Sequence, residues 1–329
     1  MLNAHNVLQR GVQSAFGTAN VTATAKLQSV GSFALTPELQ TRSLSQLRGT
    51  LAPAHQTALD MYMSNATFEV PDETFEDINY WFESLFATAA PGGTGPYTRA
   101  YAAPLTAEAA PKFMTLQWGQ TGKVWQMNDA SIATLTLSGA NNTGIQVGGS
   151  LIGGQVVTGT LAALNDRTGL TRITGCQAAL AIDAWGGTVG ATAVASSAFS
   201  WELTINPNRQ YRAYLGECTP SAWNDQPWTG QLRLSLELNN TTDNYLEAIL
   251  GTASTILERV IEIKYDNGAA AADNRKFTLQ FAGHTLEAPQ MFQDRNGVTT
   301  YDLVFEGVYN PTMANWLKID TASGIALLV

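Results

Sequence analysis

Two stretches of the chain alternate apolar and polar residues in the manner of a half-buried β-strand. Ala66, Phe68 and Val70 alternate with polar neighbours, and residues 232–238 carry leucine at every second position. A period of two residues places one face of a strand in the core and the other in solvent. Each stretch is followed by apolar residues at helical spacing, within residues 78–85 and 245–250. The pattern therefore predicts a strand followed by a short helix in two places.

Other landmarks recur in the same order in both halves of the chain. The paired segments are residues 15–17 and 184–186, 33–37 and 201–207, 114–119 and 261–266, and 144–154 and 297–307. Ordered recurrence of this kind indicates a tandem duplication. We predict a mainly β chain of two duplicated β-sandwich or barrel domains, residues 1–157 and 171–329, each with one short helix and joined by a linker at residues 158–170.

The composition narrows the class of protein further. Only 14% of the residues are charged, the formal net charge is −9, and the 18 Lys and Arg residues are scattered, so a nucleic-acid binder is disfavoured. Low charge is expected of a chain that hides much of its surface in subunit contacts, although a monomer rich in small polar residues would look the same. We expect no membrane span and no signal peptide, and a product that stays in the cytoplasm where it is made.

No residue pattern that carries catalysis is evident. The histidines, His5, His55 and His284, have no partner motif, and no hydrolase, zinc-protease or nucleotide-loop signature is present. We therefore predict that the chain is not an enzyme and has no catalytic residue, cofactor or metal. Cys176 and Cys218 lack a CxxC arrangement and are interpreted as reduced packing residues.

Four acidic residues cluster before the first predicted helix: Asp72, Glu73, Glu76 and Asp77. A cation site or a carboxylate pair for acid/base chemistry would explain them, but capping of the helix N-terminus, where negative charge is favourable, explains them better. We expect Thr74 or Asp72 to be the N-cap of this helix, and Thr241 or Thr242 that of the second.

Several segments of the chain resemble the tail tube proteins of long-tailed, non-contractile bacteriophages. They are residues 46–54 (QLRGTLAPA), 95–105 (GPYTRAYAAPL), 161–168 (LAALNDRT), 182–188 (IDAWGGT) and 309–318 (YNPTMANWLK). The resemblance implies the tail-tube fold and a structural role in the virion. Rings of six units then stack into a hollow tube, assembled in the cytoplasm of the bacterial host.

A chain that supplies two units predicts a ring of three chains with pseudo-sixfold symmetry, with a ring of six chains as the runner-up. The resemblance also implies partners: the chain itself, a tape measure protein, and terminator and tip proteins. DNA would pass through a neutral or acidic lumen without specific binding.

The polar loops at residues 40–57 and 208–228 are the candidates for contacts between stacked rings. Their candidate contact residues are Arg42, Leu47, Arg48, Arg209, Arg212, Trp223 and Trp228.

Two other classes of function stay open. The tryptophans and the loops rich in Asn, Thr and Gly are also found in carbohydrate-binding β-sandwiches. Most tryptophans are expected in the core, and Trp223 and Trp228, both in the second polar loop, are the exceptions. A hydrolase with an unrecognised site is the weaker possibility.

Overall fold

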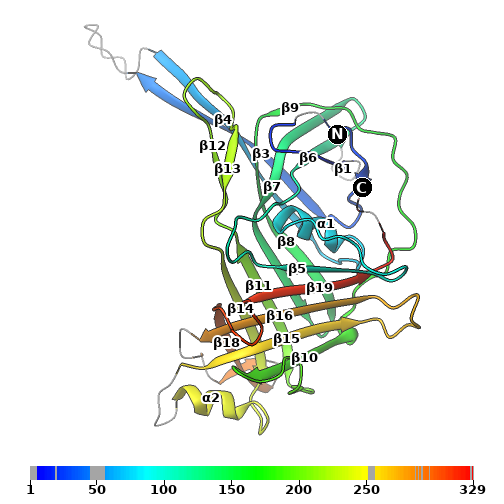
Figure 1. Ribbon diagram of the computed structural model, residues 1–329, viewed down its shortest axis with the longest axis vertical. Helices are drawn as coiled ribbons and strands as arrows, with labels where there is room; N and C mark the ends of the chain where they lie inside the picture. The colour runs from blue at the N-terminus through cyan, green and yellow to red at the C-terminus, as the bar shows by residue number, and fades with distance from the viewer. Residues whose placement is uncertain are drawn as a thin grey trace.

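The computed structural model describes residues 6–18, 21–44, 56–250, 256–285, 287, 289, 292–295, 297–326 and 328. Within this part the chain is mainly β, as predicted, with strands β1 to β19 and two short α-helices (Figure 1). Neither α-helix is long and apolar enough to cross a membrane.

The first half of the chain contains nine of these strands and one α-helix. They are β1 (Val7–Val12), β2 (Ala25–Lys26), β3 (Ser32–Leu44), β4 (Gln56–Val70), α1 (Ile78–Leu85), β5 (Tyr97–Ala102), β6 (Met114–Gln120), β7 (Lys123–Ala140), β8 (Thr143–Gly153) and β9 (Val156–Thr158). The predicted strand at residues 66–70 lies in β4, and the predicted helix is α1.

The second half begins after an irregular segment, residues 159–171. Its elements are η2 (Gly175–Gln177), β10 (Ala178–Ala184), β11 (Ala198–Asn206), β12 (Gln210–Arg212), β13 (Ala222–Asn224), β14 (Thr229–Glu237), α2 (Asp243–Leu250), β15 (Glu258–Asp266), β16 (Lys276–Thr285), β17 (Gln293–Arg295), β18 (Val298–Gly307) and β19 (Leu317–Ser323). The leucine alternation falls in β14, where the leucines are buried and residues between them are exposed or half-buried.

One antiparallel sheet runs through both halves in the order β3, β4, β8, β7, β11, β14, β18. The halves meet in it where β7 pairs with β11. Two smaller sheets pack against its inner side, one formed by β2, β1, β6, β7 and β9 and the other by β10, β15, β16, β19 and β5. Strand β7 is long enough to belong to the first small sheet at its start and to the large sheet at its end.

Each half uses a corresponding set of strand pairs. The pairs β1–β6, β3–β4, β4–β8, β6–β7, β7–β8 and β7–β9 of the first half correspond in order to β10–β15, β11–β14, β14–β18, β15–β16, β16–β18 and β16–β19 of the second. A helix follows the second strand of the corresponding hairpins in both cases, α1 after β4 and α2 after β14.

The two helices differ in burial. Every residue of α1 is buried, whereas α2 buries Tyr245 and Leu246 and exposes its end. Helix α1 lies between the halves, because Phe82 stacks on Phe277 of β16 and Phe86 packs against Trp228. The second half of the chain therefore covers α1.

Polar groups of the second half hold both ends of α1. Near its start, the Arg275 guanidinium binds the Glu76 carboxylate, with Nε 3.2 Å from Oε1. At its end, Arg209 donates to the carbonyl oxygens of Ser84 and Leu85, both at 3.2 Å, while its own charge is paired with Asp225. A cation at the C-terminus of a helix satisfies carbonyls that have no helical partner and interacts favourably with the helix dipole.

The expected N-cap of α1 needs correction. The N-cap of α1 is Asp77, whose side chain makes no capping hydrogen bond, and the Thr74 hydroxyl accepts the backbone N–H of Asp77 at 3.1 Å in the turn before the helix. Glu73, Glu76 and Asp77 are buried. In the second half Thr242 directly precedes α2, and the Asn239 side chain accepts the N–H groups of Thr241 and Thr242.

The buried acids bind both neighbouring and distant groups of the chain. Glu73 accepts hydrogen bonds from Trp81 Nε1 and from the N–H of Thr74, and Asp77 pairs with Arg167 of the segment between the halves. Burial raises the pKa of Glu73 to about 8, with the neighbouring Asp77 charge adding to the shift. Removing one side chain from a buried polar network of this kind leaves its partners without hydrogen bonds and destabilises the fold.

Replacing Arg209 by methionine is expected to lower the free energy of unfolding by ~3–5 kcal/mol, because Asp225 would keep a buried charge without a partner. Urea denaturation of the unassembled chain measures this. Arg212→Met is the control, because Arg212 is exposed, and it should change stability by less than ~0.5 kcal/mol. Equal effects of the two substitutions would contradict the assignment of Arg209 to the junction.

The raised pKa of Glu73 predicts a pH dependence. Since the folded value of about 8 exceeds the reference value of 4.5, the folded state binds more protons between these values, and the free energy of unfolding falls as pH rises through this range. The slope from one group reaches at most ~1.4 kcal/mol per pH unit. Glu73→Gln should lose the part of the pH dependence that comes from this carboxyl. The free energies of unfolding of the variant and the wild type, measured between pH 5 and 8.5, should therefore converge or cross as the pH rises. A constant difference between them would contradict the burial of an ionisable carboxyl here.

Candidate functional site: the outer face of the shared sheet

The outer face of the large sheet is a continuous polar surface built by both halves. Strand register places Ser32, Glu69, Gly148, Thr136, Thr204, Gln231 and Glu306 in one row across seven strands. A second row contains Gln146, Ser138, Glu202, Arg233 and Val304. Residues in register share a face, and their neighbours along each strand point to the core. We call this surface the shared polar face.

Acidic groups dominate the charge of the shared polar face. Leaving aside the hairpin beyond Gln40, its charged side chains in these seven described strands are Glu38, Glu69, Glu202, Glu237, Asp302, Glu306 and Arg233. Arg233 is itself paired with Asp302, which raises the pKa of the guanidinium. The remaining carboxylates give the face a negative potential, which repels a polyanion.

The shared polar face is hollowed near the junction of the halves. A cavity of about 450 Å³ lies over β7, β11 and β14, with Glu202 and Asp302 in its lining and Arg295 on its far side, where Arg295 donates to Ser200 Oγ at 3.3 Å. Its lining is mainly polar, so the hollow is a concave part of the shared polar face.

The predicted contact loops lie at one end of the molecule. The loop expected at residues 40–57 is strand at both of its described ends, because β3 runs to Leu44 and β4 begins at Gln56, and the two strands project from the body as a long hairpin (Figure 1). Residues 45–55 lie outside the described residues. Arg42 lies on this hairpin, exposed and 3.5 Å from Asp60 of its own chain. Leu47 and Arg48 lie outside the described residues.

The second loop folds back along the first. Strands β12 and β13 form a small hairpin that runs beside β3 and β4, and the carbonyl of Cys218 accepts the N–H of Tyr62 at 2.8 Å. Tyr214 and Leu215 at its tip are exposed, as is Arg212. Two hairpins thus point in the same direction and present exposed side chains at one end.

The other predicted contact residues are engaged inside the chain. Arg209 is 5% exposed and bound to Asp225 and to α1, so the acid that pairs with it belongs to the same chain and not to a ring opposite. Trp223 packs edge-on against Phe113, and Trp228 packs against Phe86. Both tryptophan rings are half-buried in these contacts.

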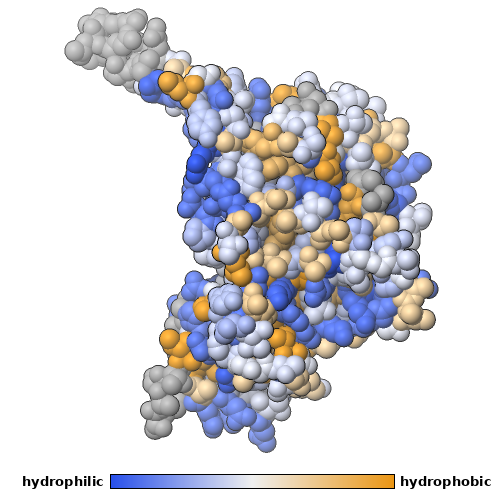
Figure 2. Space-filling view, viewed as in Figure 1, coloured by the Kyte–Doolittle hydropathy of each residue, from blue (hydrophilic) through white to orange (hydrophobic). Residues whose placement is uncertain are grey.

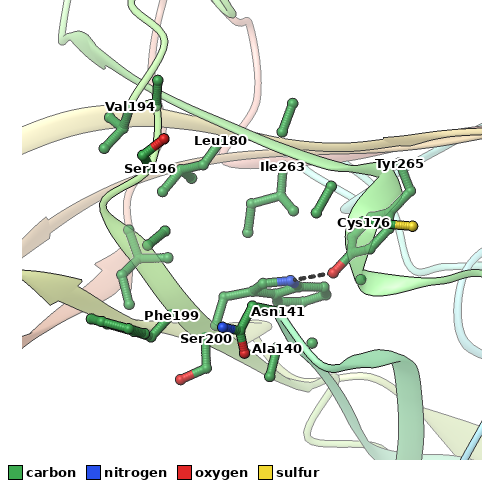
Figure 3. Close-up of a pocket in the computed structure, with 18 of the residues that line it drawn as sticks. Ala140, Asn141, Cys176, Leu180, Val194, Ser196, Phe199, Ser200, Ile263 and Tyr265 are labelled. Carbon is green, nitrogen blue, oxygen red and sulfur yellow. Dashed lines mark hydrogen bonds between the residues drawn. The ribbon is translucent and has the colours of Figure 1, made fainter. Parts of the chain in front are cut away.

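A second hollow is mainly apolar and is lined by the end of β7 and by residues of the second half (Figure 3). Its volume is about 500 Å³, and Leu180, Val194 and Ile263 are among the residues that line it. Trp201 Nε1 donates to the Tyr265 hydroxyl at 2.9 Å inside it. The lining has no carboxylate, imidazole or amine; its ionisable side chains are the Cys176 thiol and the Tyr265 hydroxyl.

The cysteine and histidine expectations have mixed outcomes. Both cysteines are free thiols, but they are exposed, so the interpretation as packing residues is wrong. His284 lies in β16 opposite Glu258 and Glu306, and His5 and His55 lie outside the described residues. In the part of the chain that the structure describes, no group of three His, Cys, Asp or Glu side chains is placed to hold a metal ion.

Comparison with known proteins adds no relative to this picture: no protein-family model matches the chain, and neither does any curated protein. The shared polar face and the two hairpins are therefore interpreted from their own geometry. The face could be traced in the sequence from polar residues at alternate positions, such as Ser200, Glu202 and Thr204 in β11, but the pairing of β11 with β7 has no local signal.

The acidic character of the shared polar face predicts that the chain does not retain duplex DNA in a mobility-shift assay at physiological salt. Converting Glu69, Glu202 and Glu306 to lysine should create binding that weakens steeply with added salt, because clustered cations release counterions from phosphates. Lysine at the scattered exposed positions Glu108, Asp273 and Glu287 changes the net charge equally and should bind far less. Equal binding by both triple variants would show that net charge, and not this face, governs the contact.

Proposed function

We propose that the chain is a structural protein of a phage tail, not an enzyme, and that it assembles into rings of three chains that stack into a hollow tube for DNA. The resemblance of its sequence segments to tail tube proteins suggests the role, and the geometry supports it in four ways. These are a repeated strand arrangement, sheet ends that correspond to one another, hairpins directed to one end, and an acidic sheet face.

A tandem duplication accounts for the repeated strand pairs. The paired sequence landmarks fall on corresponding strands: residues 33–37 and 201–207 on β3 and β11, and residues 144–154 and 297–307 on β8 and β18. Residues 114–119 and 261–266 likewise fall on β6 and β15. Sequence and topology therefore agree on the same correspondence, which supports two tail-tube-like units in one chain, with residues 158–170 between them.

The observation that carries the ring proposal is the β7–β11 pair. It joins the first unit to the second inside the chain, with Ala140 opposite Ser200 and Gly139 opposite Trp201. At the outer end of the first unit, β3 corresponds to β11 and pairs only with β4 among the described strands. At the outer end of the second unit, β16 and β17 both pair with β18 and together correspond to the single long strand β7, which pairs with β8. Strand β17 leads into the turn before β18 as the end of β7 leads into the turn before β8.

Repeating the internal junction between two chains covers both ends. By strand register, Ser32 and Phe33 correspond to Ser200 and Trp201. Asp294 and Arg295 correspond to Gly139 and Ala140. Since Ser200 lies opposite Ala140 inside the chain, Ser32 of one copy would lie opposite Arg295 of the next. Edge strands that keep unpaired N–H and C=O groups invite further pairing, and a heterologous contact of this kind closes into a ring when its rotation divides the circle. With two units in each chain, three chains complete six places.

In such a ring the shared polar face lines the lumen and continues from chain to chain. A wall rich in Ser, Thr and Glu has few cations to hold a phosphate backbone, which suits rapid passage of DNA. The two hairpins at one end then meet the next ring, where Arg42, Arg212 and the exposed Leu215 are placed for contact. Tape measure, terminator and tip proteins are partners by the resemblance alone.

A disulfide between registered positions tests the ring. In a C176S C218S background, Ser32→Cys combined with Arg295→Cys should form disulfides between chains under mild oxidation, since directly opposed residues of antiparallel strands lie ~4.5–5.5 Å apart. Denaturing gels should show a ladder that ends at three chains. The matched positive control is Ala140→Cys with Ser200→Cys, the corresponding pair inside the chain, which should yield only an internal disulfide.

Each of the single-cysteine variants should remain monomeric on the same gels, or at most form random dimers. A ladder that ends at six chains would replace the three-chain ring with the six-chain ring. Absence of any disulfide-linked oligomer, while the internal control forms its disulfide fully, would contradict the proposed ring.

A further inference from the structure

Helix α2 leaves apolar side chains exposed at a position where α1 has none. Leu85, the last residue of α1, is fully buried, whereas Leu250, the last residue of α2, is 48% exposed. Ile256, which precedes β15, is 66% exposed. The first half covers α1 on one side, where Trp81 stacks on Phe68, and the second half covers it through Phe277 and Trp228. Within one copy α2 lacks cover corresponding to that of the second half.

The opposite end of the molecule carries an apolar groove. It has a volume of about 340 Å³ between the base of the β3–β4 hairpin and strands β6, β7 and β9, and Leu39, Tyr62, Trp118 and Trp125 are among its lining residues. Leu39 is 57% exposed and Trp125 is 41% exposed. Figure 2 shows apolar surface both at the hairpin end and at the α2 end of the molecule.

The groove corresponds to the surface of the second half that contacts the end of α1. Phe86, directly after α1, packs against Trp228, the residue directly before β14, with ring centroids 5.3 Å apart. In strand register Phe68 of β4 corresponds to Leu234 of β14, and Tyr62 precedes Phe68 by as many residues as Trp228 precedes Leu234. Tyr62 therefore occupies, in the first half, the place of the side chain that receives the end of α1.

We propose that the end of α2, with Leu250 and Ile256, seats in this groove of a second copy of the chain. The groove and α2 lie at opposite ends of one molecule, so a chain cannot fill its own groove (Figure 1). The contact is heterologous and repeats from copy to copy, and it buries two apolar surfaces that are exposed in the single chain. This inference rests on the proposed function and adds a side-chain contact to the backbone pairing of β3.

Two substitutions test the two apolar surfaces one at a time. Leu250→Glu damages the helix end and Leu39→Glu damages the groove, and both change exposed positions, so each variant should keep the thermal unfolding profile of the wild type. Each alone should fail to form rings at concentrations where the wild type assembles, because a charge would be buried against apolar groups. Leu105→Glu is the matched control: Leu105 is 49% exposed, lies in neither surface and should leave assembly unchanged.

Mixing the two variants gives the decisive readout by analytical ultracentrifugation. One intact helix end and one intact groove remain in the mixture, so heterodimers should appear and no larger rings. If either variant alone assembles like the wild type, or if the mixture gives no heterodimer, α2 does not seat in the groove, even where the wild type forms three-chain rings. If Leu250→Glu unfolds, Ile256→Glu replaces it. A wild type that never forms rings would instead overturn the proposed function.

Discussion

The antiparallel pairing of β7 with β11 is the constraint on which the rest of the architecture depends. It merges two sets of strands into one sheet, gives that sheet a single polar face, and places α1 where both halves can cover it. Because backbone groups must find partners, a sheet joined in this way also has two outer ends whose pairing one chain does not complete with its own described strands. The ring that we propose follows from repeating the same junction between copies.

The polar groups around α1 make this junction specific. Arg209 and Arg275 reach across from the second half to the two ends of one helix, and Asp225 and Glu76 balance their charges. Buried ion pairs contribute little net stability compared with apolar packing, but they penalise any arrangement that leaves one charge alone. The network therefore favours one relative placement of the halves, which is what a subunit that must fit identical neighbours requires.

Local pattern was sufficient to predict elements but not their long-range partners. The alternation of apolar and polar residues around Phe68 and Leu234 and the helical spacing in α1 follow from burial on one side of each element. Both patterns could therefore be recognised in the sequence. The end of β3 was missed because a hairpin that projects into solvent has polar residues on both faces, so alternation disappears. The burial of Arg209 was also missed, since the helix end that it contacts, at Ser84 and Leu85, belongs to the other half of the chain. The burial of Glu73 was missed because an acid in a cluster before a helix is expected to be a solvated cap.

The candidate surface was predictable only in part. Alternate polar residues mark one face of each strand, and the acidic balance of the composition carries over to that face. Their union into one surface depends on strand order, which the sequence alone does not specify. The exposure of Cys176 and Cys218 likewise depends on where the loops lie and has no local signature.

The central claim is that this chain, as two fused units, builds a tube from three-chain rings. Electron cryo-microscopy of the concentrated wild-type protein tests it most directly, through the rotational symmetry of whatever particles form. The account predicts hollow rings or tubes with threefold symmetry, pseudo-sixfold at low resolution, in which β3 of each chain joins the sheet of the next. Uniform single chains at all concentrations, or assemblies in which the acidic sheet face points outward, would contradict it.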